Sequence, residues 1–174
     1  MLKVIKKRWY SRTFTVLEES NAVADSRLSF LREKGVLTVQ GQSYAMHPEG
    51  FFSRRYLLES AGSVSARAQN VQRYHHIRCL IHHAGRQYAL PEEPGFDRAR
   101  CPFGSDILVF LLNDTQIGSI SRENSLTFRG TVDLPHDIPL PVKIFIICLA
   151  LITWKYEAQE QDTGGTGGLS QRIG

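Results

Sequence analysis

Four histidines surround a cysteine between Arg73 and His83, and this segment is the best candidate in the sequence for metal chemistry. They are His75, His76, His82 and His83, with Cys79 between them. In a helix, His75, Cys79 and His83 would share one face and neighbouring pairs could bind zinc. In a strand, residues four apart lie roughly 13 Å from one another, too far to share an ion. The alternation of Ile77, Cys79 and Ile81 favours the strand, so we predict no metal and no cofactor.

Motifs for nucleophilic or phosphate chemistry are absent from the sequence. It contains no G-x-S-x-G elbow, no H-E-x-x-H pair, no Walker A sequence and no dinucleotide-binding glycine fingerprint. Asp133 and Asp137 flank Pro135 and His136, and we interpret the two carboxylates as turn and helix-capping groups rather than an acid/base pair. We therefore predict a protein that is not an enzyme.

Basic residues beside aromatic ones suggest a binding surface. Lys3, Lys6, Lys7 and Arg8 precede Trp9 and Tyr10, and Arg54 and Arg55 follow Phe51 and Phe52. Cations next to amphipathic rings suit an anionic phospholipid surface. The same composition would suit single-stranded nucleic acid, a protein partner or simple solvation. We take these six cations as candidate lipid-binding residues and disfavour nucleic acid.

Composition and charge indicate one ordinary globular domain. The chain has 174 residues, of which 42% are hydrophobic and 10% aromatic, and its net charge of +4 arises from 21 Lys and Arg against 17 Asp and Glu. Cys79, Cys101 and Cys148 have neither metal nor redox spacing and are odd in number. No apolar segment follows the basic start. We expect a cytoplasmic protein, peripheral at the inner face of the membrane.

Short segments in which apolar and polar residues alternate predict about ten strands. These strands would position the candidate residues described above. The expected strands are Arg12–Leu17, Ala22–Ala24, Leu28–Leu31, Val36–Val39, Tyr56–Leu58, Val64–Ala68, Arg73–His82, Gln87–Leu90, Ile107–Leu112, Gln116–Ser121 and Ser125–Val132. Three stretches repeat one pattern of apolar strand, polar turn and small-residue strand: FTVLEESNAVADSR, YLLESAGSVSARAQ and FLLNDTQIGSISRE. We interpret this pattern as a recurring hairpin.

The run from Ile138 to Trp154 is the longest apolar segment and predicts a helix over about 139–157. It is shorter than the roughly 20 apolar residues that span a bilayer, although Lys143 and Lys155 could extend it by snorkelling. Asp137 would cap the helix, and Lys155 would lie near its C-terminal end. Apolar residues lie on every face of this helix, so protein must cover every face. Its predicted core residues are Ile144, Phe145, Ile147, Cys148, Leu151, Ile152 and Trp154.

Many short strands and one wholly apolar helix predict a mainly β (α+β) fold, a closed antiparallel β-barrel of about ten to twelve strands around a hydrophobic C-terminal helix. The domain would span residues 1–158, and residues 159–174, with Gly164-Gly165 and Gly167-Gly168, would form a flexible tail.

YLLESAGSVSARAQ, ILVFLLNDTQIGSISRE and DLPHDIPLPVKIFIICLALITW resemble the tubby C-terminal-domain-like superfamily, which includes phospholipid scramblases and LURP-one-related proteins. The resemblance extends to about Tyr156 and implies a twelve-stranded barrel around a hydrophobic helix. It brings no phosphoinositide-binding, calcium-binding or palmitoylated motif to this sequence. We expect a non-enzymatic binding module at an anionic membrane surface or on a protein partner. The alternatives are a scramblase-like protein that moves phospholipids and a regulatory or toxin-neutralising partner.

Overall fold

A computed structural model describes the chain over residues 1–6, 12–29, 33–50, 55–73, 76–90, 107–112, 115–122 and 129–164. Within these ranges, the backbone alone is described for 70–79, 90, 107–110 and 153–164. Lys7, Arg8 and Arg54 of the predicted basic set, and the predicted turn at Asn113-Asp114, lie outside the described residues.

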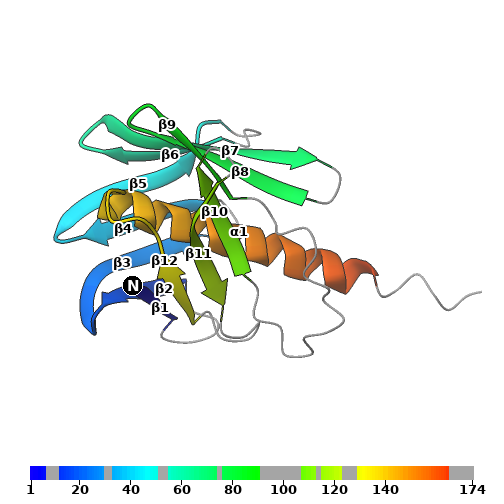
Figure 1. Cartoon of the computed structure of the whole chain (residues 1–174), viewed down its shortest axis with the longest axis horizontal. Coiled ribbons are helices and arrows are strands. Elements are labelled where there is room, and N and C mark those ends of the chain that lie inside the picture. The colour runs from blue at the N-terminus through cyan, green and yellow to red at the C-terminus, as the bar shows by residue number, and fades with distance from the viewer. Residues whose placement is uncertain are drawn as a thin grey trace, which may run out of the picture.

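Twelve antiparallel strands form a closed barrel, followed by one helix (Figure 1). The strands are β1 (Leu2–Lys6), β2 (Thr13–Glu18), β3 (Asn21–Ser29), β4 (Lys34–Val39), β5 (Gln42–Pro48), β6 (Arg55–Ser60), β7 (Ser63–Arg73), β8 (His76–His83), β9 (Arg86–Leu90), β10 (Ile107–Leu112), β11 (Thr115–Arg122) and β12 (Gly130–Asp133). The helix is α1 (Leu140–Gly164). The predicted closed antiparallel barrel is confirmed.

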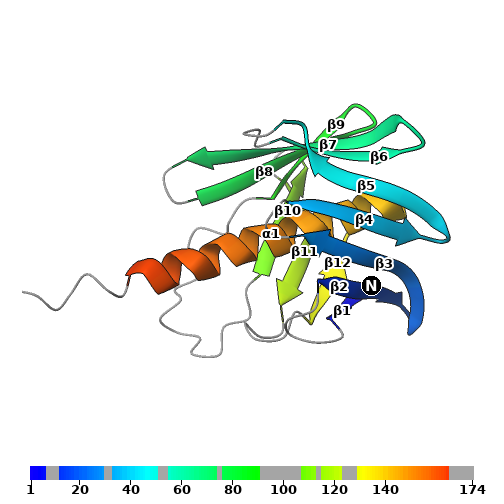
Figure 2. The same ribbon diagram turned by 180° about the vertical axis from the view of Figure 1, so that it is seen from behind.

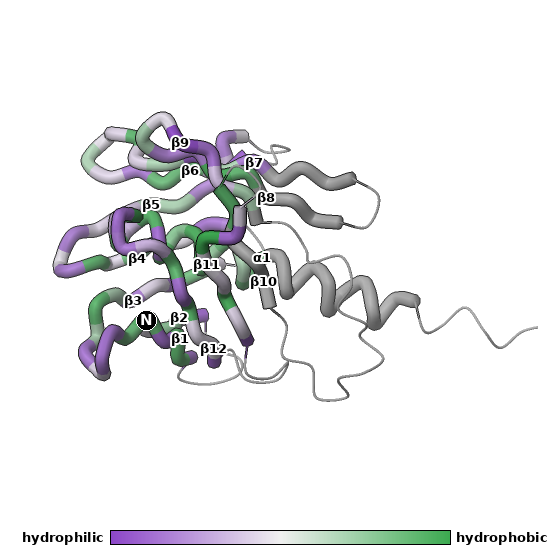
Figure 3. Tube along the Cα trace, in the orientation of Figure 1, coloured by the Kyte–Doolittle hydropathy of each residue, from purple (hydrophilic) through white to green (hydrophobic). Residues whose placement is uncertain are grey.

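Each strand pairs with its neighbours in the sequence, and β1 pairs with β12 to close the barrel. At this seam Leu2 is opposite Val132 and Val4 is opposite Gly130. A Cβ atom on Gly130 would lie 2.3 Å from the carbonyl oxygen of Ser121, so only glycine fits there. Hydropathy alternates along the strands (Figure 3), as expected for a barrel with an apolar inner face.

The repeated sequence pattern corresponds to three bulged hairpins, β2–β3, β6–β7 and β10–β11. The register shifts between Val16 and Leu17, between Leu58 and Glu59, and between Phe110 and Leu111. Each shift lies just before the last two residues of the first strand of its pair. Bulges increase local twist and curvature. The prediction of a recurring hairpin is therefore confirmed, and the three hairpins are spaced four strands apart around the barrel.

Three strands, β1, β3 and β5, differ most from the sequence expectation. β1 and β5 were not predicted, and the separate runs Ala22–Ala24 and Leu28–Leu31 belong to one strand, β3, which ends at Ser29. Within β5 only Met46 is fully buried, so the apolar alternation is weak. Its place is fixed by pairing with β4 and β6 on either side.

Helix α1 begins at Leu140 and not at a capping aspartate. The amides of Val142 and Lys143 donate to the carbonyl oxygen of Pro139, whereas Asp137 pairs with Arg86 of β9, 2.5 Å from its Nη1. The prediction that Asp137 caps the helix is therefore wrong. Pro141 is tolerated because the first amides of a helix have no acceptor within it.

The helix continues to Gly164, beyond its expected end near residue 157. Residues 155–162 (KYEAQEQD) include several strong helix formers, which explains the extension. Lys155 is therefore not at the end of the helix, and residues 159–164 are helical instead of belonging to a flexible tail.

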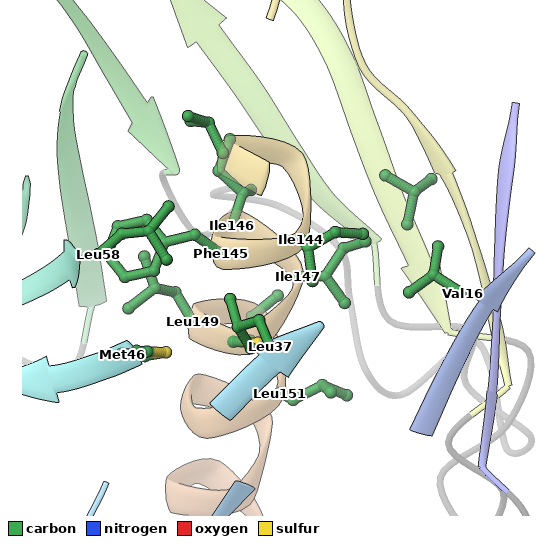
Figure 4. Close-up of a cluster of buried hydrophobic side chains, with 14 of the residues drawn as sticks. Val16, Leu37, Met46, Leu58, Ile144, Phe145, Ile146, Ile147, Leu149 and Leu151 are labelled. Atoms are coloured by element: carbon green, nitrogen blue, oxygen red, sulfur yellow. The ribbon is translucent and has the colours of Figure 1, made fainter. Parts of the chain in front are cut away.

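The first half of the helix belongs to the same hydrophobic core as the strands. Every residue from Ile144 to Ile152 is at most 5% exposed. In Figure 4, Phe145 and Leu149 point towards Leu58 and Met46, whereas Ile147 points to the other side, towards Val16 of β2. Strands lie in front of and behind the helix in the two opposite views (Figures 1 and 2).

Lys143 is half-buried, whereas its neighbours Val142 and Ile144 are fully buried. The Lys143 side chain is therefore not fully enclosed, as its apolar neighbours are. Full burial would be costly for an unpaired charge. Within the residues that the structure describes, no helix combines the length and apolarity needed to cross a bilayer.

Candidate functional site

The barrel has two different ends. At one end, which we call the hairpin end, two-residue turns join β2 to β3, β4 to β5, β6 to β7 and β8 to β9. The other end is where β1 finishes and β6 begins, and the C-terminal turns of α1 extend beyond the strands on that side (Figures 1 and 2). We call it the helix-exit end.

The described members of the predicted basic set do not form one cluster. Lys3 lies near the hairpin end and is exposed, whereas Lys6 and Arg55 lie at strand termini of the helix-exit end. Lys6 shares the inward face of β1 with Leu2 and Val4, and burial lowers the pKa of its ammonium group. Nη1 of Arg55 lies 3.6 Å from Oε2 of Glu49, which offsets part of its charge.

Lys6 and Arg55 lie at the helix-exit end together with five cations that the sequence did not single out. Near its strand termini lie Lys6, Arg12, Arg27, Lys34, Arg55, Arg122 and Arg129, with Glu33 and Glu49 as the acidic side chains there. The corresponding region of the hairpin end holds Glu18, Glu19, Glu59, Asp133 and Asp137, with Lys3, Arg86 and Lys143 of the first helical turn as cations. Among the side chains described, the helix-exit end is therefore basic and the hairpin end acidic.

A small open hollow lies at this basic end, between β1, β11, β12 and α1. Its cavity volume is about 10 Å³, room for roughly one water molecule. The floor consists of the aliphatic side chains Val4, Ile120, Val132, Ile147 and Leu151. Arg122 and Arg129 also line the hollow, the first half-buried and the second exposed.

The histidine segment forms strand β8, as predicted. His82 is exposed, and Nδ1 of His83 lies 2.9 Å from the carbonyl oxygen of Ser65 on β7. His75 lies outside the described residues, and the side chains of His76 and Cys79 are not described. The described part of the chain contains no group of three or more His, Cys, Asp or Glu that could hold a metal ion.

Among the groups outside the hollow, His47 and Cys148 both have raised pKa values. Nε2 of His47 lies 3.0 Å from Oε2 of Glu59, and this hydrogen bond, with a second one to the carbonyl of Pro48, raises the pKa of His47. Burial raises the pKa of the Cys148 thiol, which lies within the helix core. Cys148 is therefore a packing residue, since thiol chemistry requires the thiolate.

Comparisons with protein-family models, with curated proteins and with solved structures found no match. The class of protein is therefore defined by geometry alone: a closed twelve-stranded antiparallel barrel that packs its hydrophobic core with one C-terminal helix.

Proposed function

We propose that the chain is a non-enzymatic binding module of the tubby-like type, in which the first half of α1 fills the interior of the barrel. The burial of Ile144 to Ile152 supports this arrangement, as do the strands on both sides of the helix. A helix that is apolar on every side is stable in water only when protein covers every side.

The module binds an anionic phospholipid surface through its helix-exit end. The observation that carries this proposal is the unequal charge of the two barrel ends, with Arg12, Arg27 and Lys34 exposed on the basic one. Each cation near an anionic bilayer contributes on the order of 1 kcal/mol to binding. Attraction of this kind falls with ionic strength, since salt screens exposed charges.

Vesicle flotation tests this function. Wild-type protein should float with phosphatidylserine-containing vesicles, remain unbound with phosphatidylcholine alone, and lose binding in high salt. Arg12→Gln with Arg27→Gln should weaken binding about thirtyfold, from two charges worth about 1 kcal/mol each. Lys3→Gln is the matched control from the opposite end and should bind like wild type. Equal losses in the two variants would refute the assignment to the helix-exit end.

The same basic end suits an acidic protein partner, the second form of the proposed function. If no vesicle composition is bound, Arg12→Gln with Arg27→Gln should instead weaken capture of the partner. The scramblase-like alternative requires α1 in lipid, and its prediction is retention of the full-length chain in carbonate-washed membranes.

A further inference from the structure

His47 and Glu59 form an ion pair on the outer face of the barrel, beside a cation of the basic surface. His47 is the penultimate residue of β5, close to the helix-exit end. Glu59 of β6 is opposite Ala45, yet its side chain reaches along the sheet, so that its Oε2 lies 3.0 Å from Nε2 of His47. The exposed Lys34 of β4 lies on the other side of His47. The pair therefore lies next to one of the charges proposed to meet the bilayer.

Both ring nitrogens of His47 face hydrogen-bond acceptors. Nδ1 lies 3.1 Å from the carbonyl oxygen of Pro48, and Nε2 faces the carboxylate of Glu59. A neutral imidazole has one N–H group and can donate only one of these hydrogen bonds, whereas an imidazolium donates both. The geometry therefore fits the protonated ring, and the hydrogen bonds to Glu59 and Pro48 accordingly raise the pKa of His47.

The charged groups around His47 come from its own strand segment and from both neighbouring strands. Lys34 lies on β4 and Glu59 on β6. Arg55 of β6 and Glu49, which follows β5, pair with each other, with 3.6 Å between Nη1 and Oε2. Among these residue types only histidine ordinarily changes its charge between about pH 5 and pH 8. The proton on His47 therefore decides whether the charge of Glu59 is compensated.

We propose that the His47–Glu59 pair makes binding to the anionic membrane depend on pH, with the tighter binding when His47 is protonated. This regulation rests on the proposed membrane function. With the proton bound, the imidazolium neutralises Glu59, and Lys34 attracts the bilayer. Once the proton is lost, the carboxylate of Glu59 is uncompensated beside Lys34, and the net charge of the three groups falls by one unit. Because the pKa of His47 is raised, this loss takes place above its ordinary value of about 6.5.

Vesicle flotation from about pH 6 to pH 8.5 tests the regulation, with phosphatidylglycerol as the anionic lipid because its phosphate stays charged throughout. Wild-type affinity should fall as pH rises through the folded pKa of His47. The fall should exceed that in His47→Gln by about fivefold, the effect of one charge near an anionic bilayer. His136→Gln is the matched control, since it removes an exposed histidine at the hairpin end, and should keep the wild-type pH dependence.

A second variant separates the ion pair from a merely structural role of His47. In Glu59→Gln the carboxylate that holds the proton is gone, so the midpoint of the pH dependence should move to lower pH. Its binding at high pH should be about fivefold tighter than that of wild type, because one negative charge is removed. An equal pH dependence in wild type and His47→Gln, or an unmoved midpoint in Glu59→Gln, would overturn the regulation while the membrane function stands. Absence of binding at every pH would overturn both.

Discussion

Replacement of Phe145 by alanine asks whether α1 belongs to the protein core or to a membrane. The phenyl ring is 0% exposed and points towards Leu58 of β6 (Figure 4). Removing a buried phenylalanine costs about 3–5 kcal/mol, from lost burial and the cavity left behind. For a domain of this size, each kcal/mol lowers the melting temperature by roughly 2–4 °C. We therefore expect a fall of roughly 10 °C.

Urea unfolding followed by circular dichroism, in buffer without detergent, measures this loss. The expected loss in Phe145→Ala is a large part of the roughly 5–15 kcal/mol by which whole domains are stable. Ile146→Val is therefore measured beside it as a milder change, with an expected cost of about 1 kcal/mol. Val36→Ala is the surface control, since Val36 is 53% exposed, and should stay within about 0.5 kcal/mol of wild type. An unchanged unfolding midpoint in Phe145→Ala, with loss of the protein from membrane fractions, would refute the core helix and favour insertion into lipid.

Three further predictions concern single side chains. Ser26 is 2% exposed and its hydroxyl has no hydrogen-bond partner in the described part of the chain, so Ser26→Ala should raise the free energy of unfolding by about 1 kcal/mol in urea titrations. Ser20 has a φ of 79°, so Ser20→Gly should stabilise by about 1 kcal/mol, whereas Ser63→Gly, outside the left-handed region, should destabilise by a similar amount in thermal melts. The hydrogen bond to Glu59 raises the pKa of His47, so it stabilises the fold below about pH 6.5, and this contribution disappears as pH rises through the folded pKa. NMR titration should show the His47 pKa returning towards its ordinary value in Glu59→Gln; an unchanged pKa would remove Glu59 as the cause.

The architecture could be predicted because its two main features, the strands and the apolar helix, each follow from a local sequence pattern. Alternation in stretches such as Ile107–Leu112 indicates strands, and an all-round apolar run such as Ile144–Ile152 requires walls on every side. A closed sheet is the simplest arrangement that satisfies both. β5 could not be found in this way, because Met46 is its only fully buried residue and its neighbours in the sheet determine its position.

The turn residues could not be predicted from local residue preferences. Glu19 and Ser20 have φ values of 49° and 79°, and Ala61 has a φ of 49°. Both residues of such a tight hairpin turn occupy the left-handed region, which favours glycine and asparagine. The chain accepts other residues there, since pairing of the flanking strands outweighs a cost of about 1–2 kcal/mol per residue.

The basic surface was only partly predictable because adjacency in sequence is not adjacency in a barrel. Lys3 and Lys6 are neighbours in the sequence, yet they lie near opposite ends of β1 and on opposite faces of it. Strand direction, which alternates around the sheet, instead brings Arg12, Arg27 and Lys34 to one end. Net charge alone therefore does not locate such a surface, and strand order does.

The hollow likewise depends on how the strands are ordered, because it forms only where β1 pairs with β12 to close the barrel. Val4, Arg122 and Ile147 come from the first strand, the penultimate strand and the helix, so no local pattern could have joined them. They meet because β1 pairs with β12 while α1 leaves through the same end.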